Sequence, residues 1–158
     1  MSLGLDAPLD ARDLLEPWFL PEYAQTPELA GYVSAHAVEA PVLARGIFWY
    51  EDQKEDFEAA VKDFMEQGWN VDEGIGPFAA FSEEVEVAKD FADQAVYGVV
   101  LVVEGLKGVS VLGLLKESGQ AGVNVQREKE WLVPCGQRVR FERMERVGDI
   151  SFLHGRLA

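Results

Sequence analysis

The chain has 158 residues, 48% of them hydrophobic, which suits one domain with a single core. Twenty-eight acidic against 14 basic residues give a net charge of −14, which argues against nucleic acid or an anionic membrane as partner. One cysteine excludes an internal disulfide, and two distant histidines make no zinc motif, so we expect no metal. With no membrane-spanning apolar run and no secretory signal, we expect a cytoplasmic protein.

Residues 1–40 are expected to form an N-terminal helical segment of the same single domain, which spans 1–158. Three prolines break this segment into short helices, and apolar residues recur in it at helical spacing. No repeat and no Pro/Gly/Ser linker divides the chain. We therefore expect residues 41–158 to form one core.

The core begins with a strand and a helix. Residues 41–50 are β-branched and aromatic and predict a strand. In residues 55–68 the apolar side chains fall on one face of a helix that ends at Gly68. An extended segment then ends at Ser82, whose hydroxyl can cap a helix over 82–94.

The second half is rich in strands. Residues 96–105 are almost continuously apolar and predict a strand buried on both faces. A strand is expected over 108–115, followed by a loop. Residues 125–134 and 137–145 are expected to form a hairpin around Pro-Cys-Gly. Helices first and strands later indicate an α+β fold.

Two carboxylates stand at the start of that expected hairpin. Glu128 and Glu130 are two residues apart, so their side chains share one face of a strand, while Lys129 points to the other. Their repulsion needs a cation, a donor or water to relieve it. From spacing alone, an exposed charged edge of a hairpin explains the pair better than a functional site does.

Three stretches in order make a more specific pattern. They are Ala44-Arg45-Gly46 in the first strand, the segment FAAFS that ends at Ser82, and the E-x-E pair before a strand. Together they resemble the arginine, serine and glutamate motifs of the mono-ADP-ribosyltransferases of the bacterial-toxin type. The resemblance covers about residues 41 to 147, most of the chain.

The resemblance implies an ADP-ribosyltransferase-like split, strongly bent β-sandwich with flanking helices and NAD in a cleft. Arg45, followed by Gly46, matches the arginine that contacts the NAD phosphates. Glu130 matches the catalytic glutamate, and Glu128 the earlier acid of members that modify arginine. Ser82 matches the last residue of the family's Ser-Thr-Ser stretch.

The chain departs from the family at the first two residues of that stretch, which are Ala80 and Phe81. In the family the first hydroxyl helps to hold the catalytic glutamate. Phe81, like other strand aromatics, is a candidate either for stacking on NAD or for the core. Ser82 is open to a capping role alone, and Arg45 to pairing with one of the many acids.

The chemistry of the assignment is consistent. Breaking the nicotinamide–ribose bond develops positive charge on the sugar, which the Glu130 carboxylate stabilises. The fork of Arg45 matches phosphate oxygens, and Glu128 orients an incoming guanidinium. We therefore expect an NAD-dependent transferase that modifies arginine in a target protein, of bacterial or phage type and able to act in a host cell. A weak or inactive binding module and an NAD glycohydrolase are the alternatives.

Overall fold

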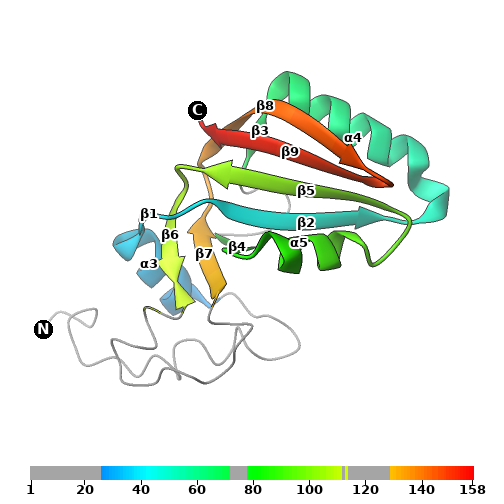
Figure 1. The fold of residues 1–158 in the computed structure, drawn as a ribbon. Coiled ribbons are helices and arrows are strands. Elements are labelled where there is room, and N and C mark those ends of the chain that lie inside the picture. The colour runs from blue at the N-terminus through cyan, green and yellow to red at the C-terminus, as the bar shows by residue number, and fades with distance from the viewer. Residues whose placement is uncertain (1–25, 72–77, 112, 114–128) are drawn as a thin grey trace, which may run out of the picture.

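The structure is a computed structural model that describes residues 26–71, 78–111, 113 and 129–158. In this part of the chain nine strands form one bent sheet in the order β1-β6-β7-β4-β2-β5-β9-β8-β3 (Figure 1). Strands β5 and β9 are parallel, and every other neighbouring pair is antiparallel. Helices cover the sheet, so the expected α+β class is confirmed.

The elements have these bounds. The helices are α3 (Pro27–His36), the 3-10 helix η1 (Glu51–Gln53), α4 (Lys54–Gln67) and α5 (Val85–Ala92). The strands are β1 (Val38–Glu39), β2 (Leu43–Trp49), β3 (Trp69–Asn70), β4 (Phe78–Ser82), β5 (Tyr97–Glu104), β6 (Lys107–Ser110), β7 (Glu130–Pro134), β8 (Arg138–Val147) and β9 (Ile150–Leu157).

The sheet has two halves that meet at one residue pair. Strands β1, β6, β7 and β4 form the first half, and β2, β5, β9, β8 and β3 form the second. Across the junction, β2 and β4 share the single pair Ala44–Ser82. In Figure 1, β6 and β7 run across the direction of β2, β5 and β9. One shared pair therefore allows the sharp bend that the resemblance implies.

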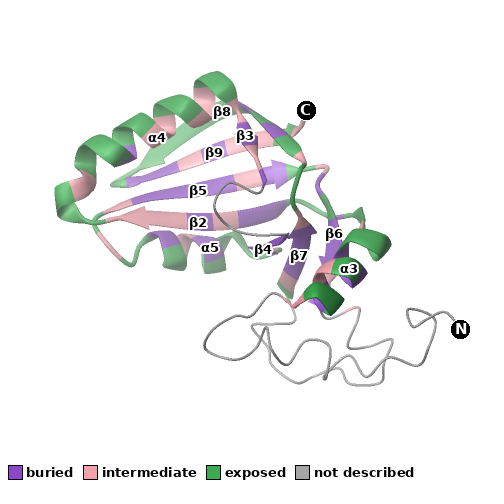
Figure 2. Cartoon of the chain, turned by 180° about the vertical axis from the view of Figure 1, so that it is seen from behind, coloured by how far each residue is buried: buried purple, intermediate pink, exposed green. Residues whose placement is uncertain are grey.

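Helix α4 covers one face of the second half. Phe57 is 2% exposed, and three further apolar side chains of the helix pack against the same core: Val61, Phe64 and Met65. The helix ends at Gly68, which has φ 73° and donates its N–H to Phe64. Strand β5 is largely buried, as Figure 2 shows, so the predicted apolar helix face and doubly buried strand are confirmed.

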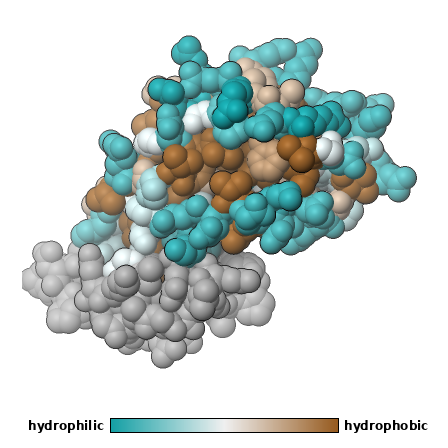
Figure 3. Space-filling model, viewed as in Figure 1, coloured by the Kyte–Doolittle hydropathy of each residue, from teal (hydrophilic) through white to brown (hydrophobic). Residues whose placement is uncertain are grey.

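Helix α5 lies close against the opposite face. A Cβ on Gly46 would lie 2.1 Å from the Ala88 carbonyl oxygen, and one on Gly98 would lie 2.3 Å from that of Ala92. Both alanines are buried. The two glycines therefore let the helix backbone approach β2 and β5. Part of this side stays open, because Figure 3 shows apolar side chains gathered over the middle of the sheet.

Helix α3 covers the first half. Thr26 caps it by accepting the N–H of Leu29, so Pro27 begins the helix, which it suits because a first-turn residue needs no N–H partner. Leu29 and Val33 are fully buried against strand residues of β4, β6 and β7. No helix among the described residues is long and apolar enough to cross a membrane.

The predicted hairpin is wrong. Strand β7 pairs with β4 and β6, and β8 pairs with β9 and β3. The Pro-Cys-Gly turn redirects the chain, because Gly136 (φ 93°) donates its N–H to Val71 and the Gln137 side chain bonds Lys107. The true hairpin joins β8 to β9 through Gly148 and Asp149, a two-residue glycine loop that favours this turn.

Two element boundaries also differ. The helix expected over 82–94 begins at Val85, because β4 continues through Ser82 in pairing with Glu130. The strand expected over 108–115 is β6, which ends at Ser110. Most of the expected helical segment 1–40, from 1 to 25, and the loop residues before Lys129 lie outside the described residues.

The close approach of α5 makes Gly46 sensitive to substitution. We expect Gly46→Ala to lower the free energy of unfolding by about 1–3 kcal/mol, because the added methyl meets backbone that must move. Chemical denaturation measures this. Gly31→Ala is the matched control: Gly31 is exposed in α3 with open space around its Cβ position, so alanine there stabilises by about 0.5–1 kcal/mol. Equal stability of Gly46→Ala and wild type would contradict the close approach.

Candidate functional site

The three motif residues lie at the junction of the two half-sheets. Arg45 is in β2, Ser82 is the last residue of β4, and Glu130 is the first of β7. The register pairs Ala44 with Ser82 and Ser82 with Glu130, so Ala44, Ser82 and Glu130 form a row across the junction. Arg45 is one residue from that row. Segments about 35 and 50 residues apart in sequence thus meet at the bend.

Arg45 is half-buried with an incomplete set of partners. Its Nη1 donates to the Ala80 carbonyl oxygen at 2.7 Å, and its guanidinium carbon lies 6.0 Å from the centre of the Phe81 ring. Its Nε is buried and has no hydrogen-bond partner among the described residues. Burial lowers the pKa of Arg45 from its ordinary value, because desolvation disfavours the charged form. Among the described residues no carboxylate forms an ion pair with Arg45. In this part of the chain, pairing with an acid therefore does not explain why the arginine is buried.

An unpartnered buried N–H on a cation points to an anion. A guanidinium stays charged in proteins. When one of its buried donors lacks an acceptor, the folded state is destabilised. Phosphate oxygens match the spacing of its donors and supply the missing charge. The Arg45 side chain thus has the chemistry to bind an anionic group such as a phosphate.

Ser82 and Glu130 are direct cross-strand neighbours on one face of the sheet. Both are half-buried. The Ser82 hydroxyl accepts the N–H of Glu84 at 2.9 Å, which closes the turn into α5. The predicted cap of the helix is wrong, because the N-cap of α5 is Glu84 and no side chain caps it; Ser82 closes the turn before the helix. A hydroxyl that accepts one bond still has its proton to donate. Ser82 can therefore serve both the turn and Glu130.

The pleat separates Arg45 from that face. Side chains alternate along a strand, so Arg45, Phe81 and Trp131 share the face opposite to Ser82 and Glu130. Arg45 lies over Phe81 and reaches the edge of β4 only through its length. The structure thus brings the three motif residues to one junction, from two faces of a bent sheet. Glu128 lies outside the described residues.

Three other motif positions have packing roles. Ala80, where the family has its first serine, packs with the cluster under α3 and presents its carbonyl to Arg45. Phe81 is 3% exposed and packs with Trp69 in the main core. Gly46 makes room for α5. A cofactor contact by Phe81 or Gly46 remains a prediction.

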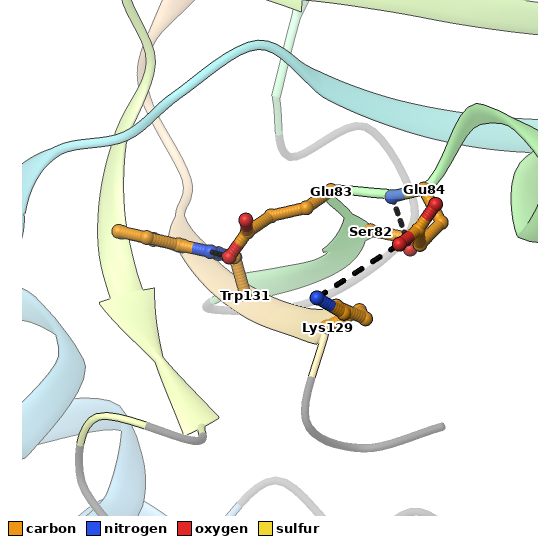
Figure 4. Close-up of polar contacts among 5 residues, drawn as sticks. All are labelled: Ser82, Glu83, Glu84, Lys129 and Trp131. Carbon is orange, nitrogen blue, oxygen red and sulfur yellow. Dashed lines mark hydrogen bonds and ion pairs between the residues drawn. The ribbon is translucent and has the colours of Figure 1, made fainter. Parts of the chain in front are cut away.

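A contact next to Glu130 was not expected from the sequence. The Trp131 indole Nε1 donates to the Glu83 carboxylate at 2.7 Å, and Lys129 lies 3.9 Å from the Glu84 carboxylate (Figure 4). Trp131 is largely buried, with 8% of its surface exposed. Losing the acceptor of a buried N–H costs about 1–3 kcal/mol. No local signal announces this pair, because its members are 48 residues apart.

Two surface hollows in the described part lie away from the junction. One of about 290 Å³ is lined by Glu142, Arg143 and His154 among others, and a neighbouring one lies beside Glu39 and Arg156. Arg45, Ser82 and Glu130 line neither, and the motif chemistry argues for the junction instead. Among the described residues no group of three or more His, Cys, Asp and Glu could hold a metal ion.

Comparison with known proteins gives a match in structure alone. No family model matches the chain, and no curated protein matches its sequence significantly. Among solved structures it is similar to the ADP-ribosyltransferase Vis, a toxin of Vibrio splendidus, with a TM-score of 0.56 and 13% identity over 94% of this chain and 72% of that one.

A second similar structure is an ADP-ribosyltransferase from Clostridium botulinum, with a TM-score of 0.51 and 12% identity over 97% of this chain and 78% of that one. A third is the ADP-ribosyltransferase HopU1 of Pseudomonas syringae (TM-score 0.49, 15% identity, 83% of this chain), and the chain spans only 48% of its length. At such identities the likeness to the Vibrio and Clostridium proteins establishes the fold alone. The bent α+β sheet of this chain is the ADP-ribosyltransferase fold.

Proposed function

We propose that the chain is an NAD-dependent mono-ADP-ribosyltransferase that modifies arginine side chains of a target protein and releases nicotinamide. One observation carries the proposal. On a fold of this kind, Arg45 with an unpartnered buried Nε lies at the same junction as the cross-strand pair of Ser82 and Glu130. The order of the motifs in the sequence predicts these three positions, and their proximity at one bend supports the proposal.

Each residue has a role that its chemistry suits. Arg45 binds the pyrophosphate through its free donors. Glu130 stabilises the positive charge that develops on the ribose as the bond to nicotinamide breaks, and nicotinamide leaves with the bonding electrons. A guanidinium nitrogen of the target then attacks the same ribose carbon. Glu128 binds that guanidinium and takes its proton.

Ser82 is proposed to act on Glu130. Ala80 has no hydroxyl, whereas Ser82 is directly opposite Glu130 on the same face. Side chains of such a pair have Cβ atoms about 4.5–5.5 Å apart, within reach of a hydrogen bond between hydroxyl and carboxylate. Ser82 would therefore hold Glu130 in place of the family's first serine.

Phe81 and Gly46 are proposed to act through their neighbours. The buried Phe81 ring supports the Arg45 guanidinium, an attraction between a cation and the face of an aromatic ring. Gly46 keeps β2 close to α5 and so fixes the strand that carries Arg45. The partners are NAD and a protein with an accessible arginine, without nucleic acid, membrane or metal.

Replacement of Glu130 tests the reaction. With NAD labelled in the adenylate part and agmatine or arginine-rich protein as acceptor, we expect wild type to label the acceptor and to release nicotinamide. Glu130→Gln should reduce both by about 100- to 1000-fold, because the neutral amide cannot stabilise the charge on the ribose. Nicotinamide without labelled acceptor would indicate a glycohydrolase. No turnover with any acceptor would refute the enzymatic proposal and favour a binding module.

Replacement of Glu128 separates the two acids. Glu128→Gln should abolish transfer to the guanidinium and spare the slower hydrolysis of NAD, because water needs no carboxylate to orient it as an acceptor. Both activities are measured in one reaction, as labelled acceptor and total nicotinamide. Survival of transfer at the wild-type rate would show that Glu128 has no such role.

Replacement of Arg45 tests the phosphate contact. Arg45→Lys keeps the charge and loses the fork, so we expect the KM for NAD to rise about 10- to 100-fold, the range of a lost charge-assisted hydrogen bond. Steady-state kinetics of nicotinamide release measure this. Arg143→Lys is the control, because Arg143 is exposed in β8 and should leave KM unchanged. An unchanged KM in Arg45→Lys would place the phosphates elsewhere.

A further inference from the structure

The segment after β4 is tied to the residues on both sides of Glu130. Glu83 donates its backbone N–H to the Lys129 carbonyl oxygen at 2.9 Å, and its carboxylate accepts from Trp131 Nε1 at 2.7 Å. The Glu84 carboxylate lies 3.9 Å from Lys129 Nζ. Figure 4 shows the side-chain contacts reaching from the turn to the start of β7. The strand end that carries Glu130 is therefore anchored from a single turn.

The Glu83–Trp131 hydrogen bond lies behind Glu130. Trp131 follows Glu130 in β7, so its side chain lies on the opposite face of the strand. Glu83, in the bend after β4, reaches this face through its hydrogen bond with Trp131. A bond on that face restrains the backbone of β7 without occupying the space in front of the Glu130 carboxylate. The Glu83–Trp131 bond can therefore fix the position of Glu130 without blocking its carboxylate.

The two side-chain contacts are unequal in strength. The Trp131 donor belongs to a side chain that is 8% exposed, and its acceptor is charged, which makes a short, strong bond. The side chains of Lys129 and Glu84 are 45% and 50% exposed, and ion pairs so open to water contribute little. Of the two side-chain contacts, the Glu83–Trp131 bond is therefore the one that restrains the start of β7 more strongly.

We propose that Glu83 and Trp131 are positioning residues, whose hydrogen bond fixes the first residues of β7 and thereby the Glu130 carboxylate for reaction with NAD. The catalytic part of this proposal rests on the proposed function. It gives Glu83 a task that its place near the start of a helix did not indicate, since negative charge there suits the helix dipole at any of several positions.

The test compares acceptor loss with acceptor replacement. Glu83→Ala removes the acceptor, and we expect kcat for nicotinamide release to fall about 10- to 100-fold with the KM for NAD within about twofold, because small misplacement of a catalytic group affects the reaction step. Glu83→Gln keeps an amide oxygen that accepts the same bond, and should restore kcat to within about threefold. Glu84→Ala, which breaks only the exposed ion pair next to it, should keep the wild-type kcat.

Three kinetic results with single variants would overturn the proposal. They are a wild-type kcat in Glu83→Ala, an equal loss in Glu83→Gln, which would implicate charge instead of the bond, and an equal loss in Glu84→Ala. In Trp131→Phe the donor is absent, so the double variant with Glu83→Ala should show no further decrease in kcat. A full additional loss in this double variant would also contradict the pair.

The experiments distinguish a wrong proposal for the enzymatic activity from a wrong proposal for the Glu83–Trp131 restraint. If wild type releases no nicotinamide, the enzymatic proposal fails, and hydrogen exchange decides the structural step. We expect the Trp131 indole N–H and the backbone amides of residues 129–131 to exchange faster in Glu83→Ala, and at the wild-type rate in Glu83→Gln. Unchanged exchange in Glu83→Ala would refute the restraint itself.

Discussion

The site depends on the single residue pair that joins the two half-sheets. Because β2 and β4 share only Ala44–Ser82, the strands separate on either side of it and the sheet can bend. Beyond the pair, Arg45 bridges the strands through its hydrogen bond to the Ala80 carbonyl. This leaves the remaining donors of Arg45 in a partly buried place next to the bend. If the hydrogen-bond ladder between β2 and β4 were continuous, the two strands would not separate beyond Ala44–Ser82. The Arg45 guanidinium would then have no space between them.

Helix α5 fixes the same junction from outside. It follows Ser82 after two residues, and its backbone lies against Gly46 and Gly98, where any Cβ would collide with it. The strand that carries Arg45 and the turn that carries Ser82 are thus held by one short helix. Since the hydroxyl of Ser82 also closes that turn, the positions of helix, turn and strand depend on one another. Arg45 and Ser82 can then keep a fixed relation although they belong to different half-sheets.

Local patterns in the sequence predicted what local forces decide. The apolar face around Phe57, the stop at Gly68 and the buried strand β5 all depend on spacing that a short window contains. The hairpin failed because the choice of strand partner is not local: β7 has β4 and β6 on either side, and the glycine turn at 148 had no counterpart among the expected elements. The order of the motifs found Arg45, Ser82 and Glu130, but not the missing partner of Arg45 Nε or the Glu83–Trp131 bond, which need the folded chain.

The two faces of β4 and β7 carry different residues at the junction. On one face Ser82 and Glu130 stand together, and on the other Glu83 and Trp131 are bonded to each other. Alternation along β7 turns the Trp131 side chain away from the face of Glu130, and Glu83 meets it there from the bend after β4. On the front face Ala80 pairs with Leu132, two residues from Glu130 along β7, and contributes only a methyl group. The Glu83–Trp131 bond restrains β7 from the back face, and this restraint does not depend on which residue stands at position 80.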